Sequence, residues 1–276
     1  MTSSPSKITP VVLAALLAAL VLVTACHKKQ AELTPDLSSS DEALYKLGEQ
    51  YLKKDSEKAI LYLRQVMDSF PKSFYAQRAK LLIADAYFKK GDESSMIMAA
   101  AEYREFIRSY PYSPSAAYSQ YQIAMTFYKK QLKPGRDPSK TIQALGEFKK
   151  VITDYPASDQ AKEAQEKIKD CEERLAGHSA EIAILYYKRR AFRASINRLV
   201  EIMTQYPNYS RLDEIYFYLG DCYFLMNVPN EAVPYFTKVV TDYPGRKVAE
   251  KASKRLAEIE KRKAAPPPAA KPKKKS

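Results

Sequence analysis

Apolar and polar residues alternate along most of the chain with the spacing of amphipathic helices, and five aromatic–proline pairs interrupt this pattern. The pairs are Phe70-Pro71, Tyr110-Pro111, Tyr155-Pro156, Tyr206-Pro207 and Tyr243-Pro244. Proline cannot continue a helix, and it pushes the residue before it out of the helical conformation. Each pair therefore predicts the end of a helix, with the aromatic ring folded back onto the core.

Small and large residues precede the pairs at fixed distances, which indicates a repeating unit of two helices. In the last unit, Leu219-Gly220 precedes Tyr223, Ala232 and Phe236 at the spacing of the tetratricopeptide repeat. The other four units carry the same residue types, and residues added or lost between units fall in turns. We predict an all-α fold, an α-solenoid of about five tetratricopeptide repeats with an inserted long helix and a C-terminal capping helix.

Local residues predict where the first helix begins, how the segment 159–190 runs and what covers the last repeat. Ser39 with Glu42 resembles a capping box at the start of the first helix. Residues 159–190 predict either one long helix or a helix bent near Gly177. Residues 246–263 form a charged amphipathic stretch that is expected to cap the last repeat.

The N-terminus predicts an export signal that ends in a lipid attachment site. Lys7 gives a basic start, and residues 11–23 are an unbroken run of apolar or small residues, shorter than the roughly 20 residues that span a bilayer. Val23-Thr24-Ala25-Cys26 resembles a lipobox, in which Cys26 is lipidated; the alternative is an ordinary signal cleaved just before this cysteine. His27 stands where an aspartate would favour the inner membrane. We therefore expect an anchor in the inner leaflet of the outer membrane, facing the periplasm.

The net charge of +13 is concentrated at the C-terminus. Residues 261–276 hold seven Lys or Arg residues and no acidic residue, whereas the rest of the chain is close to balanced. The Lys/Pro tail within this segment cannot bury apolar area and is expected to be disordered. Because an exported protein meets no nucleic acid, the tail's candidate contacts are peptidoglycan, lipopolysaccharide or anionic lipid. The alternative is a solvated tail with no partner.

No set of residues predicts catalysis or metal binding. The chain has no Gly-rich phosphate loop, and its only histidines are His27 and His178. Adjacent carboxylates such as Glu172-Glu173 are typical of an exposed helix face. Cys171 and Cys222 could pair in an oxidising periplasm, although buried single thiols fit two isolated cysteines better. We expect no enzyme activity, no cofactor and no bound metal.

The first helices of stacked helix pairs line one face of such an array, and rings and cations gather there in the first three units. The predicted groove consists of Tyr45, Lys53, Arg78, Phe88, Lys89, Tyr118, Tyr121, Tyr128 and Lys129. Lysines near a helix C-terminus also complement the helix dipole, by about 0.3–1 kcal/mol each, which explains them without a ligand. Dipole complementation does not require tyrosines. We therefore predict that the groove binds an extended peptide, with rings holding apolar side chains and a lysine holding a carboxylate.

The stretch from residue 175 to residue 207 contains a distinctive run of residues: His178, Ile182-Ala183, Tyr186, Lys188-Arg189, Ala191-Phe192 and Ala194-Ser195-Ile196-Asn197-Arg198. This run resembles the hallmark of the BamD (ComL) family of outer-membrane β-barrel assembly lipoproteins. The lipobox, the five repeats, the turn insertion in the third unit and the helical cap also match, so the resemblance covers nearly all of residues 20–262. The chain departs from the family pattern at Arg190, where a turn glycine is usual, and at Gly177.

The resemblance implies a scaffold of the outer-membrane β-barrel assembly machinery. In the family, the N-terminal repeats receive C-terminal targeting strands of unfolded outer-membrane proteins. The C-terminal repeats dock on the POTRA-bearing β-barrel insertase, which also gathers other assembly lipoproteins. This implies a docking role for Asn197 and Arg198, for which a surface salt bridge is the alternative. A generic tetratricopeptide envelope lipoprotein serving secretion, pilus or division machinery would share the anchor and the repeats, but not the Ile-Asn-Arg run.

Together these features divide the chain into five segments. They are a signal peptide (1–25), the lipidated Cys26 with a polar tether (26–40), repeats 1–3 as the substrate-binding side (41–157), the long helix with repeats 4–5 and the capping helix as the complex-docking side (158–263), and the Lys/Pro tail (264–276).

Overall fold

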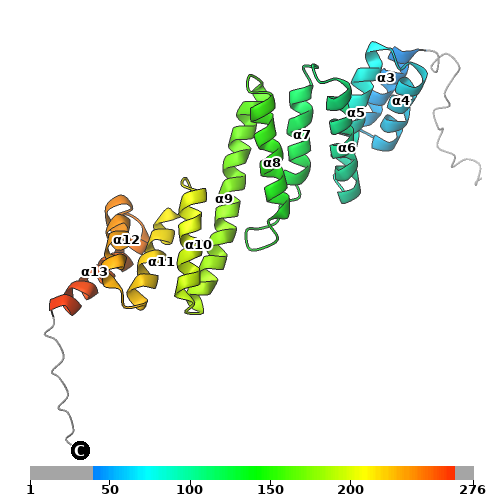
Figure 1. The fold of residues 1–276 in the computed structure, drawn as a ribbon. Helices are drawn as coiled ribbons and strands as arrows, with labels where there is room; N and C mark the ends of the chain where they lie inside the picture. Colours follow the sequence, from blue (N-terminus) through cyan, green and yellow to red (C-terminus); the bar gives the residue numbers. More distant parts are fainter. Residues whose placement is uncertain (1–39, 265–276) are drawn as a thin grey trace, which may run out of the picture. The chain divides into compact units, whose positions relative to one another are not determined.

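The computed structural model describes residues 40–264, and this part of the chain forms eleven α-helices and no strand (Figure 1). Backbone contacts divide the protein into two compact units, the first ending at Ala79 and the second beginning at Lys80. The predicted signal peptide, the Cys26 lipid site and nearly all of the tether and tail fall in residues 1–39 and 265–276, outside the described part.

The first unit contains α3 (Asp41–Leu52), α4 (Ser56–Ser69) and the beginning of α5 (Phe74–Lys90). The cap of α3 is Ser40, whose Oγ accepts the Ala43 N–H at 3.3 Å, so the predicted capping box was placed one residue too early. A short turn brings α3 and α4 side by side. A Cβ at Gly48 would lie 2.5 Å from the Leu63 side chain, so only glycine permits this close approach.

The second unit continues from α5 with eight further helices that stack in chain order, each beside the next (Figure 1). They are α6 (Glu93–Ser109), α7 (Ala116–Tyr128), α8 (Ser139–Asp154), α9 (Asp159–Lys188), α10 (Phe192–Gln205), α11 (Leu212–Leu225), α12 (Pro229–Asp242) and α13 (Lys247–Ala264). Successive helices joined by short turns are the arrangement predicted for tetratricopeptide repeats. The all-α repeat fold is confirmed.

The aromatic–proline pairs end helices as predicted. The aromatic residue of every pair is a C-cap whose backbone N–H donates to the carbonyl four residues earlier. The five C-caps are Phe70, Tyr110, Tyr155, Tyr206 and Tyr243. The proline that follows cannot extend the helix, so all five second helices stop at the same point of the repeat.

The second helix of every pair buries the same three positions. The first position holds a small residue, the second an aromatic residue or leucine, and the third an apolar residue. In all five pairs each of these residues is at most 1% exposed. These residues are Ala59, Leu63 and Val66; Ala99, Tyr103 and Phe106; Ala144, Phe148 and Val151; Ser195, Leu199 and Ile202; and Ala232, Phe236 and Val239. The repeat spacing thus selected the core of each unit correctly.

The long helix α9 is continuous over 30 residues, which resolves the two alternatives for this segment in favour of one helix. Gly177 lies inside this continuous helix, and a Cβ there would meet Pro134 at an ordinary 3.5 Å. Pro134 belongs to the loop inserted between α7 and α8, and its carbonyl oxygen lies 2.6 Å from the Nδ1 atom of His178. The inserted loop therefore packs along α9.

Cys171 and Cys222 are both buried and free. Burial raises the pKa of each thiol to about 11, so neither is ionised at neutral pH. The prediction of two buried single thiols is confirmed.

Three residues of the second unit adopt a left-handed backbone conformation in turns. Their φ angles are 75° at Gly91, 59° at Arg190 and 61° at Asn227. Glycine adopts this conformation freely and asparagine tolerates it, whereas other residues lose about 1–2 kcal/mol. Arg190, at the position where the resemblance leads us to expect a turn glycine, therefore adopts the left-handed conformation at a cost in stability.

Replacing Arg190 with glycine is expected to raise the free energy of unfolding by about 0.5–1 kcal/mol. Glycine removes the backbone strain of a left-handed arginine, but its greater freedom in the unfolded chain offsets part of this gain. Chemical denaturation measures the difference. Arg189→Gly is the matched control, because Arg189 has a φ of −82° and gains nothing from glycine. Equal destabilisation by both variants would contradict the account.

Candidate functional site

A hollow of about 590 Å³ opens in the second unit at the C-terminal ends of α5 and α7 and the beginning of α6. We call it the lysine hollow. It is lined by Phe88, Lys89, Gly91, Met96, Lys129 and Lys130. Three of the predicted groove residues, Phe88, Lys89 and Lys129, thus lie together. The lining contains three lysines and no carboxylate.

The repeat itself holds these side chains in place. The Nζ atom of Lys129 lies 4.0 Å from the centroid of the Phe88 ring, a cation–π distance. Lys130 donates to the carbonyl oxygen of Gly91 at 2.7 Å, which ties the end of α7 to the turn after α5. Met96 is buried and closes the floor. The Phe88 ring and the ammonium groups of Lys129 and Lys130 are therefore positioned before any ligand arrives.

The lysine hollow combines positive charge with apolar surface. Lys89 stands in the last turn of α5, and Lys129 is the C-cap of α7, so each also complements a helix dipole. Dipole complementation acts on each helix separately, and it does not require lysines of two helices to line one hollow. An ammonium group forms its strongest hydrogen bonds with an anionic oxygen. A carboxylate beside an apolar or aromatic side chain matches this lining.

Tyr118 belongs to a neighbouring polar cluster. Its hydroxyl donates to Asp85 at 2.9 Å, and the buried Tyr103 donates to the same Asp85 oxygen at 2.5 Å. Burial raises the pKa of Asp85, while the two hydroxyls oppose the rise. The Tyr103 ring also packs against Phe88 at 6.5 Å between centroids. Tyr118 therefore packs partly buried in this cluster, with its hydroxyl bound to a carboxylate of the chain itself, and it does not line the lysine hollow.

Tyr121 and Tyr128, also assigned to the groove, pack between helices. Both rings contact Phe148 of α8, with centroids 5.5 and 5.8 Å away. Tyr121 is only 8% exposed, and the hydroxyl of Tyr128 donates to Asp170 of α9 at 2.9 Å. Burial raises the pKa of each hydroxyl to about 12. These rings hold α7 against α8 and α9, and neither lines the lysine hollow.

The other three predicted groove residues lie in the first unit. Tyr45 is buried, donates to Glu49 at 3.0 Å and has its pKa raised to about 12 by burial. The Arg78 guanidinium lies over the Tyr45 ring and over Phe74, at 5.8 and 5.1 Å from the centroids. Lys53 is the exposed C-cap of α3. Only Lys53 and Arg78 of this group present charge at the surface.

Sequence reasoning missed half of the lining of the lysine hollow. Gly91 lies in the turn after α5 and Met96 in α6, the second helix of the second repeat, whereas the predicted groove consisted of first-helix positions. Lys130 follows Lys129 and lies just beyond α7. The adjacent lysines were visible in the sequence, but the contact of Lys130 with Gly91 joins residues 39 apart.

The two residues assigned to insertase docking lie on the exposed side of α10. Asn197 and Arg198 are both exposed, and Arg198 donates to Glu201 at 3.0 Å. This is the surface salt bridge that the sequence left open as the alternative. Such exposed pairs contribute little to stability, so the guanidinium can exchange this partner for another at small cost.

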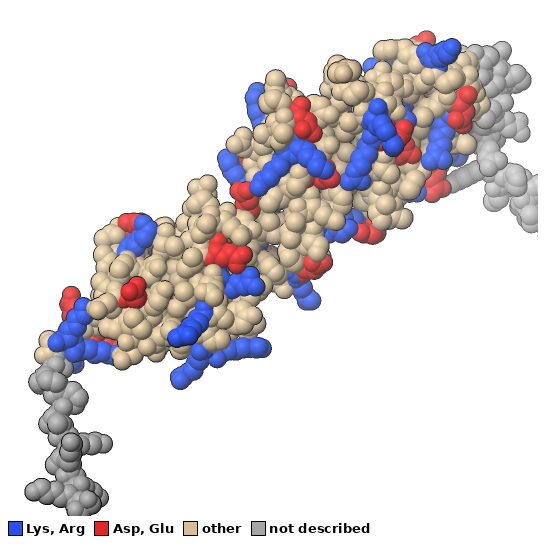
Figure 2. All heavy atoms as spheres, viewed as in Figure 1, with Lys and Arg blue, Asp and Glu red and all other residues tan. Residues whose placement is uncertain are grey.

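The described residues contain no group of three or more acidic, His or Cys side chains arranged to hold a metal ion. Between residues 40 and 264, no helix combines the length and the apolar character that crossing a membrane requires. Figure 2 shows Lys and Arg interspersed with Asp and Glu on the visible face of the second unit.

Comparison with known proteins gives relatives over most of the chain. The chain is 28% identical over 240 residues to the outer membrane protein assembly factor BamD of Pasteurella multocida, and the match covers 83% of this chain and 89% of that protein. It is 27% identical over 221 residues to the same-named protein of Haemophilus influenzae, covering 76% and 82%. Among solved structures, the chain is similar to the TPR2AB-domain:pHSP90 complex of yeast Sti1, with 81% of this chain and 85% of that chain covered, a TM-score of 0.44 and 14% identity.

The family model described as YfiO, outer membrane lipoprotein, matches residues 38–235. This range contains the first four aromatic C-caps. It also contains the lysine hollow and the residues Asn197 and Arg198. Because the match covers well over half of the sequence, the chain belongs to the YfiO family of outer membrane lipoproteins.

Proposed function

We propose that this protein is a non-enzymatic lipoprotein scaffold of the outer-membrane β-barrel assembly machinery, and that the lysine hollow binds the C-terminal targeting strand of unfolded outer-membrane proteins. The relatives named as outer membrane protein assembly factors support the first part. The lining of the lysine hollow supports the second, because it joins an aromatic ring to three lysines.

A targeting strand that ends in an aromatic residue with a free carboxylate fits this lining. The terminal ring packs on Phe88 and Met96, and the carboxylate accepts hydrogen bonds from Lys89 and Lys129. Tyr118 is proposed as a contact for residues earlier in the peptide, and Lys53 and Arg78 are proposed as peptide contacts of the first unit taken by itself. Tyr45, Tyr121 and Tyr128 are proposed to support the groove through packing, since their rings lie against neighbouring helices.

Titration of the full chain with a ten-residue peptide ending in phenylalanine tests the proposed strand binding. The free acid is expected to bind at least about tenfold more tightly than the same peptide with an amidated C-terminus, because amidation removes the anionic partner of the lysines. Isothermal titration calorimetry measures both affinities. Equal affinity for the acid and the amide would remove the proposed carboxylate site.

Arg198 is proposed to contact the POTRA-bearing insertase. Arg198→Glu is expected to reduce recovery of the insertase when the tagged protein is purified from envelopes in detergent. The fold is expected to persist, because the lost salt bridge to Glu201 is exposed. Lys238→Glu is the matched control, since it removes another exposed salt bridge, to Asp242 on α12. Unchanged recovery with Arg198→Glu would remove the contact.

The anchor and the tail complete the proposal. The family is one of outer membrane lipoproteins, and we propose Cys26 as the lipidated residue, with the repeats facing the periplasm. The basic tail is proposed to contact peptidoglycan or anionic lipid. A generic envelope scaffold for secretion, pilus or division machinery is the alternative function, which the protein's co-purifying partners would reveal.

A further inference from the structure

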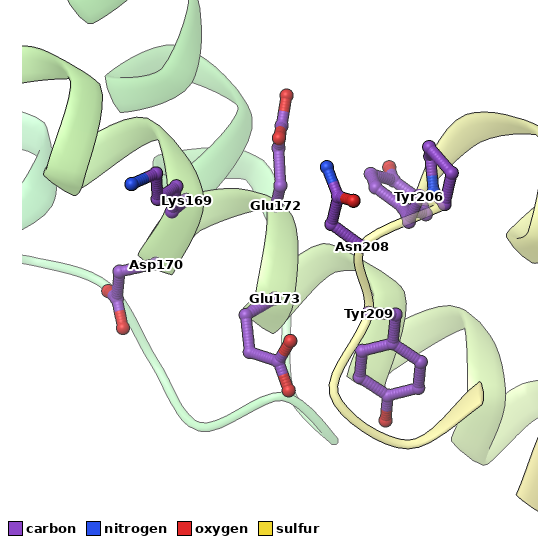
Figure 3. A pocket seen from close by; sticks show the side chains of 8 residues that line it. Lys169, Asp170, Glu172, Glu173, Tyr206, Asn208 and Tyr209 are labelled. Carbon is purple, nitrogen blue, oxygen red and sulfur yellow. The ribbon is translucent and has the colours of Figure 1, made fainter. Parts of the chain in front are cut away.

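A second hollow, of about 390 Å³, lies between α9 and the loop that joins α10 to α11 (Figure 3). We call it the acidic hollow. It is lined by Lys169, Asp170, Glu172, Glu173, Tyr206, Pro207, Asn208 and Tyr209. The charged residues all come from α9, and the rings, the proline and the amide come from the loop and the C-cap before it. Neither the proposed strand binding nor the proposed contact of Arg198 uses this hollow.

The charge of the acidic hollow is negative in a chain whose net charge is +13. Lys169 is its only cation, and its ammonium pairs with Glu166 at 2.8 Å. Asp170 is already held by Arg174, at 2.8 Å, and by the Tyr128 hydroxyl. Two carboxylates remain to be accounted for, those of Glu172 and Glu173.

Glu173 and Glu172 differ in how firmly the chain holds them. Glu173 accepts from both the backbone N–H and the hydroxyl of Ser210, which fixes it against the loop. Glu172 has only a long salt bridge to Lys149, at 3.5 Å, and its side chain is 38% exposed. The Glu172 carboxylate is therefore the group in this hollow that is best able to accept a new cation.

The groups around Glu172 suit one kind of cation. Figure 3 shows Glu172 and Asn208 directed to the same side of the hollow, with the Tyr206 ring next to Asn208. Glu172 also raises the pKa of Tyr206, after the larger effect of burial, so carboxylate and ring share one environment. A planar guanidinium can stack on such a ring while its N–H groups donate to a carboxylate and an amide oxygen. An ammonium group has no flat face with which to stack.

We propose that the acidic hollow binds an arginine side chain of a protein partner. The guanidinium stacks on Tyr206 and donates to Glu172 and to the side-chain oxygen of Asn208. The charge of the hollow is complementary to a basic partner, whereas the lysine hollow selects an acidic chain end. The two sites would therefore hold partners of opposite charge on the same second unit.

The probe for this proposal is the peptide acetyl-Gly-Arg-Gly-amide, added to the full chain with ring-labelled tyrosine and followed by NMR. The Tyr206 signals, assigned with Tyr206→Phe, are expected to shift saturably. The corresponding lysine peptide is expected to bind at least about tenfold more weakly, and the citrulline peptide, which has the same shape without the charge, to leave the signals in place.

Two variants test the role of the carboxylate. Glu172→Gln is expected to weaken binding of the arginine peptide at least about tenfold. Asp159→Asn is the control on the same helix, since Asp159 and its partner Lys162 both lie outside the lining, and it is expected to bind like the parent protein. Circular dichroism checks that both remain folded. An equal shift with the citrulline peptide, no saturable shift with arginine, or unchanged binding by Glu172→Gln would each overturn the proposal.

Discussion

Replacing Arg255 with methionine is expected to lower the free energy of unfolding by about 3 kcal/mol. Arg255 of α13 reaches Asp221 of α11, where the guanidinium Nε lies 2.7 Å from the carboxylate and the Asp221 side chain is 2% exposed. The variant leaves this buried carboxylate with the Tyr187 hydroxyl as its donor. A buried charge that loses its counter-ion is among the largest single-residue costs in proteins. Chemical denaturation of the full chain measures the loss.

Arg262→Met is the matched control for this prediction. Arg255 and Arg262 both lie over the Phe224 ring, at 4.4 and 4.5 Å from its centroid, so both variants lose a similar ring contact. The partner of Arg262 is the exposed Glu258, and its loss is expected to cost little. Adding Asp221→Asn to Arg255→Met should restore much of the stability, because the unpaired charge is gone. Equal destabilisation by the two arginine variants would contradict the role given to Asp221.

Replacing Lys129 with glutamate is expected to weaken binding of the phenylalanine-terminated free-acid peptide at least about tenfold, and more at low ionic strength. The substitution removes an ammonium that stands 4.0 Å from the Phe88 centroid and puts a like charge next to the peptide carboxylate. Lys129 is exposed and forms no salt bridge with any residue of the described range, so the fold is expected to remain intact. Calorimetric titration measures the affinity.

A charge-matched control separates this effect from the loss of general attraction. Lys133→Glu makes the same charge change on the inserted loop, outside the lining of the lysine hollow. It is expected to alter the affinity only slightly. The amidated peptide should respond much less to Lys129→Glu than the free acid does, because the two changes remove the same interaction. If Lys133→Glu weakened binding as much as Lys129→Glu, the carboxylate site would be misplaced.

The fold could be predicted from the sequence because each repeat encodes its own local signals. The pair Tyr206-Pro207 ends α10 for a local reason, since proline cannot continue a helix. The spacing of Leu199 and Ile202 before this pair identifies the buried face of the helix. The course of α9 was harder to predict. Periodicity fits a straight or a bent helix at Gly177, and the contact beside it comes from Pro134, a residue 43 positions earlier.

The candidate site could be predicted only in part. Phe88, Lys89 and Lys129 stand near the ends of first helices, so the repeat register alone brings them to one edge. Tyr128 stands at the position equivalent to Phe88, but it meets Asp170 of the inserted long helix instead of an open groove. That partner is set by tertiary packing 42 residues away, which no local pattern reports.

The proposed function rests most directly on which proteins this chain holds in its own envelope. Purification of the tagged full chain in mild detergent, followed by mass spectrometry with quantification, measures this. We expect recovery of a POTRA-bearing β-barrel protein in near-stoichiometric amount. Recovery of secretion, pilus or division proteins in its place would contradict the assembly role, and the repeat fold would then serve a different envelope machine.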